Sequence, residues 1–342
     1  MRVEEFDYSL PSSLIAQYPP AQRGESRLMV LHRSRETIEH REFKDIPDYL
    51  HPGDLLVMNN TRVLPARLIG KKETGGTCEI LLIPSWNGEK EAWEVLIKRA
   101  RKLKEGSRIQ FGEGLSGEVK EVKDGKGKIR FSSQGEIIEI LRRIGHVPLP
   151  PYIKRKDEPL DRERYQTVFA ERDGSIAAPT AGLHFTPSLL ESLRGRGVST
   201  LLTTLHIGIG TFAAVKVKNV EDHSMEAEWI EIPEETATRI EETKKRKGRV
   251  IAVGTTATKA LESFSGPDGQ VKSGKNLSSL FIYPPYHFRV IDGLITNFHL
   301  PKSTLVMLVS AFAGKELLMK AYGEAIDRGY RFYSYGDAML IL

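Results

Sequence analysis

The chain has 342 residues, of which 40% are hydrophobic and 28% are charged, and its formal net charge at pH 7 is +5. This is the composition of an ordinary soluble globular protein, and the length predicts about two domains that can each bury a core. The single cysteine, Cys78, excludes an internal disulfide framework and a zinc site built from cysteines.

The first residues, 1–7, are acidic and contain no apolar core, so they are not predicted to form a secretory signal. The longest apolar run, 305–313, is too short to span a bilayer. We therefore expect a cytoplasmic protein with no membrane partner. We also expect a monomer. Two strands, 28–31 and 54–58, are predicted before residue 60 and are assigned to the larger domain.

Residues 62–147 differ from the rest of the chain in pattern. Short β-prone runs alternate with turns that contain glycine, which indicates a small antiparallel sheet or barrel. The predicted strands are 67–69, 79–83, 93–97, 108–111 and 128–131, and a short helix at 136–143 follows them. The proline cluster at 148–151 then marks a domain joint. We predict an α/β main domain, residues 1–61 plus 148–342, with an inserted small β-barrel domain at 62–147.

The inserted segment also holds the basic excess of the chain. Its eighteen Lys and Arg residues face only twelve Asp and Glu residues. Five cations lie within 98–104, and such a cluster is either a solvated surface hairpin or a site for the phosphates of a nucleic acid. The residues that we expect to bind the nucleic acid are Arg62, Lys98, Arg99, Arg101 and Lys102.

From residue 186 onward, strands and helices alternate, which is typical of an α/β layer structure. Predicted helices are 188–196, 233–247, 255–264, 303–312 and 315–327. Predicted strands are 198–205, 249–253, 280–283, 289–291, 330–333 and 338–342.

Three runs in this domain each place a histidine among Gly, Thr or Asn at the end of an apolar or β-prone stretch. They are 178–185 with His184, 204–212 with His206, and 296–301 with His299. A single histidine of this kind is more often structural, but three in one region favour a shared cleft. Asp337 is a further candidate for this cleft.

Two glycine-containing segments suggest ligand contacts. In 250–256 a buried strand runs through Gly254 into a helix whose first amides suit a carboxylate or a phosphate, although a plain strand-to-helix turn explains the segment equally well. Residues 208–213 fit a loose dinucleotide pattern, but the β-prone residues that follow argue against a nicotinamide site. Neither a P-loop nor a hydrolase elbow occurs in the sequence.

Eight runs, most of them long, are distributed from one end of the chain to the other, at 59–68, 145–152, 161–170, 174–186, 204–212, 254–256, 295–313 and 330–339. In these runs the chain resembles the S-adenosylmethionine:tRNA ribosyltransferase-isomerase family.

The resemblance implies a step in queuosine biosynthesis. Members of this family transfer and isomerise the ribosyl moiety of S-adenosylmethionine onto 7-aminomethyl-7-deazaguanine in the tRNA anticodon. The products are epoxyqueuosine-tRNA, adenine and methionine. S-adenosylmethionine is consumed as a substrate, so no cofactor and no metal are expected. The family fold is similarly an α/β domain with an inserted barrel.

The reaction requires a base for the C5′ proton, an acid for the departing adenine and contacts for the methionine end. We expect His184 and His206 to be catalytic. The residues expected to bind substrate are Thr180, Gly182, Gly208, Gly210, Thr255, Thr256, Asn297, His299 and Asp337. The chain departs from the family pattern at Ala214, Glu226, Lys259 and Pro285, where relatives usually carry Pro, His, Arg and Gly.

Two alternatives belong to other classes. One is a catalytically silent homologue that binds tRNA through the basic β-domain without turnover. The other is a nicotinamide oxidoreductase, which rests only on 208–213.

Overall fold

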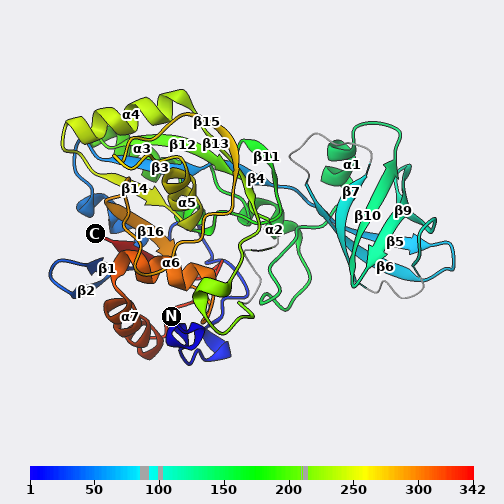
Figure 1. The fold of residues 1–342 in the computed structure, drawn as a ribbon, viewed down its shortest axis with the longest axis horizontal. Coiled ribbons are helices and arrows are strands. Elements are labelled where there is room, and N and C mark those ends of the chain that lie inside the picture. The colour runs from blue at the N-terminus through cyan, green and yellow to red at the C-terminus, as the bar shows by residue number, and fades with distance from the viewer. Residues whose placement is uncertain (85–91, 99–102, 209, 211–214) are drawn as a thin grey trace.

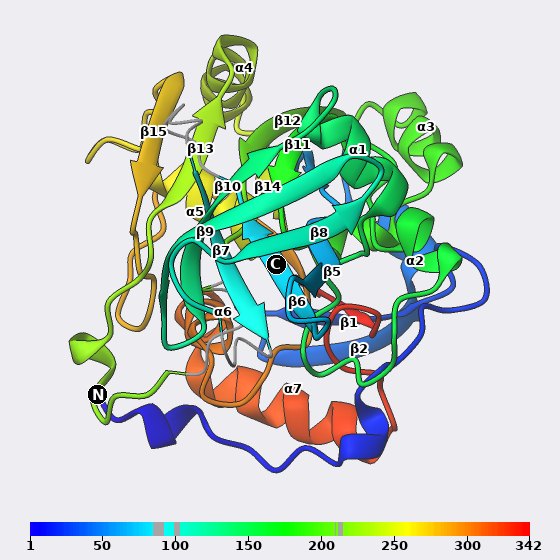
Figure 2. The same cartoon turned by 90° about the vertical axis from the view of Figure 1, so that its right-hand side faces the viewer.

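The computed structural model describes residues 1–84, 92–98, 103–208, 210 and 215–342. Figure 1 shows an α/β body that contains both termini and, to its right, a separate β-barrel. Figure 2 looks onto the barrel along the line that joins the two bodies. The predicted fold class, an α/β main domain with an inserted small β-barrel, is therefore confirmed.

Within the described residues, the main domain contains a nine-stranded mixed sheet. Its spatial order is β15-β13-β12-β3-β14-β16-β17-β1-β2. The strands are β1 (Arg27–His32), β2 (Thr37–Glu42), β3 (Leu55–Asn59), β12 (Ser199–Leu205), β13 (Glu228–Ile232), β14 (Val250–Val253), β15 (Gly274–Ser278), β16 (Gly293–Asn297) and β17 (Ala338–Ile341). The pairs β12–β3, β3–β14, β14–β16 and β1–β17 are parallel.

Both faces of this sheet are covered. Alternate residues of each central strand point to opposite faces, so the two faces contribute to two different apolar clusters. In β3, Leu55 and Val57 join one apolar cluster, whereas Leu56 and Met58 join another. The second cluster is covered by α3 (Pro187–Gly195) and a 3-10 helix, η3 (Phe43–Tyr49).

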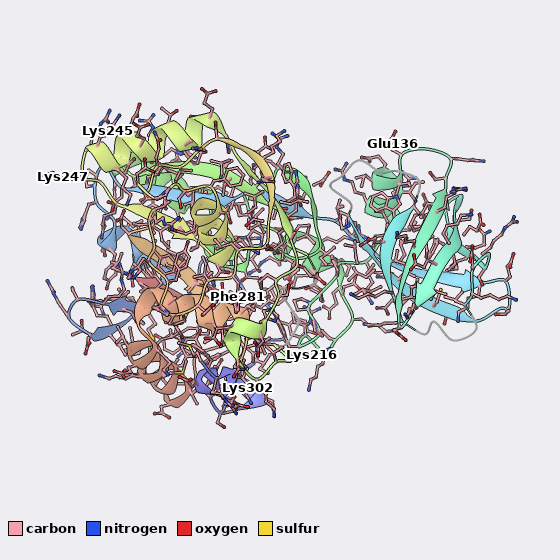
Figure 3. The ribbon with its side chains drawn as sticks, viewed as in Figure 1. Glu136, Lys216, Lys245, Lys247, Phe281 and Lys302 are labelled. Carbon is pink, nitrogen blue, oxygen red and sulfur yellow. The ribbon has the colours of Figure 1, made fainter. Side chains whose placement is uncertain are left out.

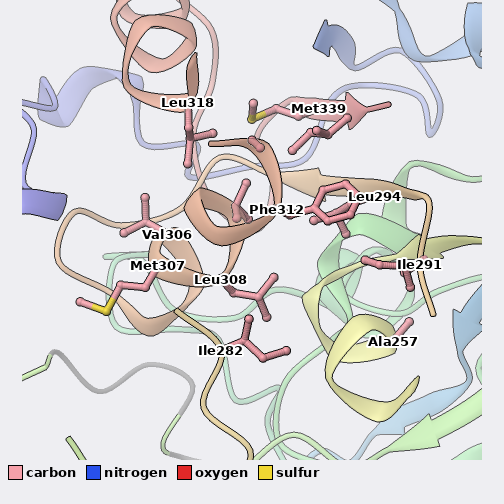
Figure 4. Packing of buried hydrophobic residues seen from close by; sticks show 14 of the residues in the cluster. Ala257, Ile282, Ile291, Leu294, Val306, Met307, Leu308, Phe312, Leu318 and Met339 are labelled. Atoms are coloured by element: carbon pink, nitrogen blue, oxygen red, sulfur yellow. The ribbon is translucent and has the colours of Figure 1, made fainter. Parts of the chain in front are cut away.

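The first cluster is covered by α5 (Thr255–Ser263), α6 (Thr304–Ala313) and α7 (Lys315–Asp327), with α4 (Glu234–Lys245) beside them. Figure 4 shows Val306 and Phe312 of α6 packed near Leu318 of α7 and Met339 of β17. α6 is apolar on nearly all sides, as expected for a helix that is buried all round.

In the described part of the chain, the inserted segment forms a closed barrel in the order β10-β7-β6-β5-β8-β9. Its strands are β5 (Arg67–Lys72), β6 (Thr77–Ile83), β7 (Trp93–Lys98), β8 (Arg108–Gly112), β9 (Leu115–Lys123) and β10 (Lys126–Ser132), and α1 (Ile137–Ile144) follows. The chain enters and leaves side by side, because the backbone amides of Arg67 and His146 each donate to the other residue's carbonyl oxygen. The exact domain limits of 62 and 147 stay a prediction.

Three shorter elements lie next to the joint. β4 (Thr61–Val63) pairs in parallel with β11 (Arg172–Ser175), and α2 (Pro159–Arg164) precedes β11.

Among the described residues, no helix is long and apolar enough to cross a membrane.

Three strands predicted in the main domain are wrong. Tyr333 has a φ of +72°, so the segment 330–333 cannot be an extended strand. In 289–291 the backbone amides donate to the Glu262 carboxylate instead of to a neighbouring strand. Residues 280–283 form irregular chain.

The basic cluster at 98–104 is described only in part. Arg99, Arg101 and Lys102 lie outside the described residues. Lys98 is exposed, with its Nζ 3.3 Å from Glu79 Oε1. A second basic run of the sequence lies at 244–249. In Figure 3, its residues Lys245 and Lys247 lie at the end of the main domain remote from the barrel, so this run does not extend the cluster at 98–104.

Candidate active site

A pocket lies where β14 and β16 end at their carboxyl edge, the place where α/β sheets bind ligands. It combines residues from all three histidine-containing runs with the start of α5. Its lining is Tyr152, Ala177, Ala178, Pro179, Thr180, Ala181, Ile207, Gly254, Thr255, Thr256, Thr296, Asn297, Phe298, His299, Leu300, Ser303, Leu305, Tyr333 and Ser334. Five expected substrate-binding residues lie in it, namely Thr180, Thr255, Thr256, Asn297 and His299.

Helix α5 directs its amino end at this pocket. Gly254 joins β14 to the helix with a φ of +96°, a conformation that favours glycine. Its amide donates to Ile295 O, which ties the turn to β16. The first-turn amides of Thr255 and Thr256 therefore face the pocket wall, where the positive end of the helix dipole favours a carboxylate.

His299 lies in the pocket lining, and its Nε2 is 2.7 Å from Thr296 Oγ1. Its backbone is held on both sides, since its amide donates to Tyr322 Oη and its carbonyl oxygen accepts from Tyr8 Oη. Burial lowers the pKa of His299 to about 3, so the ring is neutral at pH 7.

His184 lies behind the pocket wall rather than in it. Its Nδ1 is 2.7 Å from Ser26 Oγ, and its Nε2 is 3.2 Å from the Nδ2 of Asn297. Burial lowers its pKa to about 4. The catalytic role that we expected of His184 is untested, and a ring with both nitrogens bonded to protein is better placed to support Asn297.

His206 lies at the end of β12, immediately before Ile207 of the pocket lining. Its Nδ1 is 2.8 Å from Thr61 Oγ1, and its ring stacks on Trp229 with the centroids 4.9 Å apart. Burial lowers the pKa of His206 to about 4, so the imidazole is in its proton-accepting form at neutral pH.

Asp337 is not part of the described pocket lining, although the sequence suggested that it would join the histidines there. Its carboxylate accepts the backbone amides of Arg27 and Arg331 at 2.9 and 2.8 Å. It also accepts hydrogen bonds from the Nε and Nη2 atoms of the Arg27 side chain. These bonds join the start of β1 to the turn before β17, so the geometry favours a structural role for Asp337 over contact with a ligand.

The three expected glycines are also outside the described lining. A Cβ on Gly182 would lie 2.7 Å from the Phe169 ring, so this glycine allows close packing. The amide of Gly208 donates to Glu228 Oε1 at 3.3 Å, and Gly210 lies against the side chain of Glu226.

Two of the departures from the family pattern lie near these glycines. Lys259 forms a buried ion pair with Glu228, with Nζ 2.9 Å from Oε2. Glu226, the position where relatives carry His, lies beside Gly210. Ala214 lies outside the described residues.

Sequence reasoning missed the aromatic wall of the pocket. The ring centroids of Tyr152 and Tyr333 lie 4.7 Å apart, and Tyr152 Oη is 2.5 Å from Ser334 Oγ. Tyr333 holds a left-handed φ of +72°, which is rare for a bulky side chain and is often found at functional sites. The signal was present in 330–339, where three tyrosines lie close to a serine and a glycine.

Arg62 lies in a second pocket, at the joint with the barrel, together with Arg142 and Arg162. Its Nη2 donates to Ala170 O, and its Nε is 4.0 Å from Asp173 Oδ1. Because its side chain is 44% exposed, Arg62 remains accessible to a phosphate.

The chain is similar to known proteins over its whole length. The model of the queuosine biosynthesis protein family matches residues 3–341. The S-adenosylmethionine:tRNA ribosyltransferase-isomerases of Halothermothrix orenii and Desulfitobacterium hafniense are 53% and 52% identical, and each match covers 100% of both chains. A crystal structure of S-adenosylmethionine tRNA ribosyltransferase from Thermotoga maritima is similar with 40% identity and a TM-score of 0.57, over 99% of this chain and 100% of that chain. Since these matches span essentially the whole sequence, the protein belongs to the family of S-adenosylmethionine:tRNA ribosyltransferase-isomerases.

Proposed function

We propose that the protein transfers and isomerises the ribosyl moiety of S-adenosylmethionine onto 7-aminomethyl-7-deazaguanine in the anticodon of tRNA. The products are epoxyqueuosine-tRNA, adenine and methionine. The observation that carries the proposal is one pocket at the carboxyl edge of the sheet, lined by segments of all three histidine-containing runs and by the start of α5.

The pocket offers contacts for both ends of S-adenosylmethionine. The amides of Thr255 and Thr256 at the start of α5 suit the methionine carboxylate. The rings of Tyr152 and Tyr333 give an aromatic surface of the kind on which a nucleobase or a sulfonium packs. Within the described lining there is no Asp or Glu, so the cationic groups must meet neutral acceptors and ring faces.

Proton transfer needs a base that is unprotonated at neutral pH. His206 stays our candidate for this role, since it is neutral and is oriented by Thr61 next to the pocket. His299 is assigned to substrate contact because it lies in the lining itself. S-adenosylmethionine acts as a substrate, and the mechanism requires no further cofactor.

The purified protein, incubated with S-adenosylmethionine and tRNA that carries 7-aminomethyl-7-deazaguanine, is expected to release adenine and methionine in equal amounts. Adenine release is measured by chromatography, and the modified nucleoside is identified by mass spectrometry after digestion of the tRNA. The matched control is tRNA with an unmodified guanine at that position, which lacks the attacking amine. If the tRNA binds but no adenine appears, the silent-homologue alternative is correct. Turnover that requires a nicotinamide would instead support the oxidoreductase.

The tRNA is proposed to contact the basic segment of the barrel and Arg62 at the joint. Changing Arg99, Arg101 and Lys102 together to Ala should weaken tRNA binding. It should also reduce the slope of log affinity against log salt by about one for each lost phosphate contact. Filter binding at several salt concentrations measures both quantities, and the affinity for S-adenosylmethionine serves as the control. Unchanged tRNA binding would show that the segment is only a solvated surface.

A further inference from the structure

The side-chain amide oxygen of Asn297 is a hydrogen-bond acceptor that receives no hydrogen bond from the described residues. The residue ends β16, lines the pocket and is 1% exposed. Its Oδ1 is buried and has no hydrogen-bond partner among the described residues. Because a buried amide oxygen without a donor costs free energy, a bound ligand that supplies an N–H would recover that cost.

The orientation of this amide is determined by its neighbours. Nδ2 donates to the carbonyl oxygen of Tyr333 at 3.1 Å and lies 3.2 Å from Nε2 of His184. Turning the amide over would place Oδ1 against the Tyr333 carbonyl, where two acceptors would repel each other. Both donors of Nδ2 are thus used inside the protein, and Oδ1 is the atom left for a ligand.

His184 completes this arrangement from behind. To accept from Asn297, its Nε2 must be unprotonated, so the ring proton is on Nδ1 and is donated to Ser26 Oγ at 2.7 Å. The ring is buried against Phe43, with the centroids 5.0 Å apart. Burial also keeps its pKa at about 4, so the accepting form is maintained at neutral pH. Ser26, His184 and Asn297 form a chain of hydrogen bonds that ends at the pocket.

We propose that Asn297 binds an N–H donor of S-adenosylmethionine through Oδ1, and that His184 is a positioning residue that holds the amide in this orientation. The inference rests on the proposed function. S-adenosylmethionine has two groups of this chemistry, the methionine ammonium and the exocyclic amine of adenine. β14 and β16 are paired neighbours, so Asn297 is close to the α5 amides that suit the methionine carboxylate.

The first test uses Asn297→Ala. The dissociation constant for S-adenosylmethionine, measured by calorimetry, should rise by about 10- to 100-fold, the usual effect of leaving a ligand donor unpaired. The inhibition constants of methionine and adenine are then measured separately. The product whose inhibition weakens carries the group that Asn297 binds. Unchanged affinity for S-adenosylmethionine in the variant would overturn the proposal.

The second test separates positioning by His184 from proton transfer. His184→Gln keeps a neutral acceptor, so its KM should stay within about threefold and its pH–rate profile should be unchanged. His184→Leu offers no acceptor, and its KM should rise by about tenfold. If the Leu variant does not fold, Ser26→Ala replaces it, because that change frees the ring to take the other tautomer. A loss of about 100-fold or more in the kcat of His184→Gln would assign proton transfer to His184 and overturn the positioning role.

His40→Gln is the matched control. The two ring nitrogens of His40 bond to Tyr330 Oη and Glu324 Oε1, outside the pocket lining. Its KM should not change, and a rise equal to that of His184→Leu would show that the effect is general and contradict the proposal. If the wild-type protein itself fails to bind S-adenosylmethionine, the proposed function fails. If the wild type binds and Asn297→Ala binds equally well, only this inference fails.

Discussion

Replacing His206 by Asn is expected to lower the turnover rate by roughly two to four orders of magnitude, the usual contribution of a general base. Asn is neutral and can keep the hydrogen bond to Thr61 Oγ1, which His206 makes at 2.8 Å. The variant therefore removes the titratable group and retains its main orienting contact. Single-turnover release of adenine from S-adenosylmethionine and modified tRNA measures the chemical step.

The affinity for S-adenosylmethionine and the melting temperature of the same variant are the controls. A base acts only in the transition state, so the affinity should be nearly unchanged. His206 also stacks on Trp229, so some loss of stability is compatible with a catalytic role. A normal rate per folded molecule, combined with a lower melting temperature, would show that His206 is structural.

Acidification from pH 7 to pH 5 is expected to lower the free energy of unfolding by about 5 kcal/mol. Burial lowers the pKa of His184 and His206 to about 4 and that of His299 to about 3, against 6.5 for an ordinary histidine. In the window between pH 6.5 and pH 4 the unfolded chain therefore binds more protons than the folded one. Stability that is present above pH 6.5 is lost as the pH falls through this window.

Urea unfolding at pH 7, 6 and 5 measures this loss, which is comparable with the whole stability of many domains. His184→Gln is the matched variant, because it removes one of the three groups and should flatten the pH dependence by about a third. Most carboxylates titrate below pH 5, so they contribute little to this window. A free energy of unfolding that is constant from pH 7 to pH 5 would contradict the pKa values of all three histidines.

Helices and the strands of the barrel were predictable from sequence wherever an apolar face was continuous. α7 was predicted at 315–327, its observed bounds, and β6 and β7 differ from prediction by one or two residues. β9 was missed because it carries only Leu115, Val119 and the small Gly117 on its inward face, with polar residues between them. The last residues of the wrongly predicted strand at 289–291 are apolar and buried, but a side-chain carboxylate takes the amides that a neighbouring strand would have bonded.

The candidate site was predictable in part, for a similar physical reason. Small and polar residues at the ends of strands indicated the pocket, and Thr180, Thr255, Thr256, Asn297 and His299 lie in its lining. The sequence could not show which histidines face the ligand. That depends on partners such as Ser26, which is far from His184 in the chain but only 2.7 Å away in the fold.

The position of β17 has a consequence for how the protein is made. β17 lies between β16 and β1, and within the described sheet β1 and β2 join the other strands only through it. β1 and β2 are synthesised long before β17, so the hairpin that they form has no partner in the main sheet until β17 has been made. Until then its buried residues, Leu28 to Leu31, have no neighbouring strand on one side. Completion of the main sheet must therefore wait for β17, and a protein without β17 would leave this first hairpin undocked.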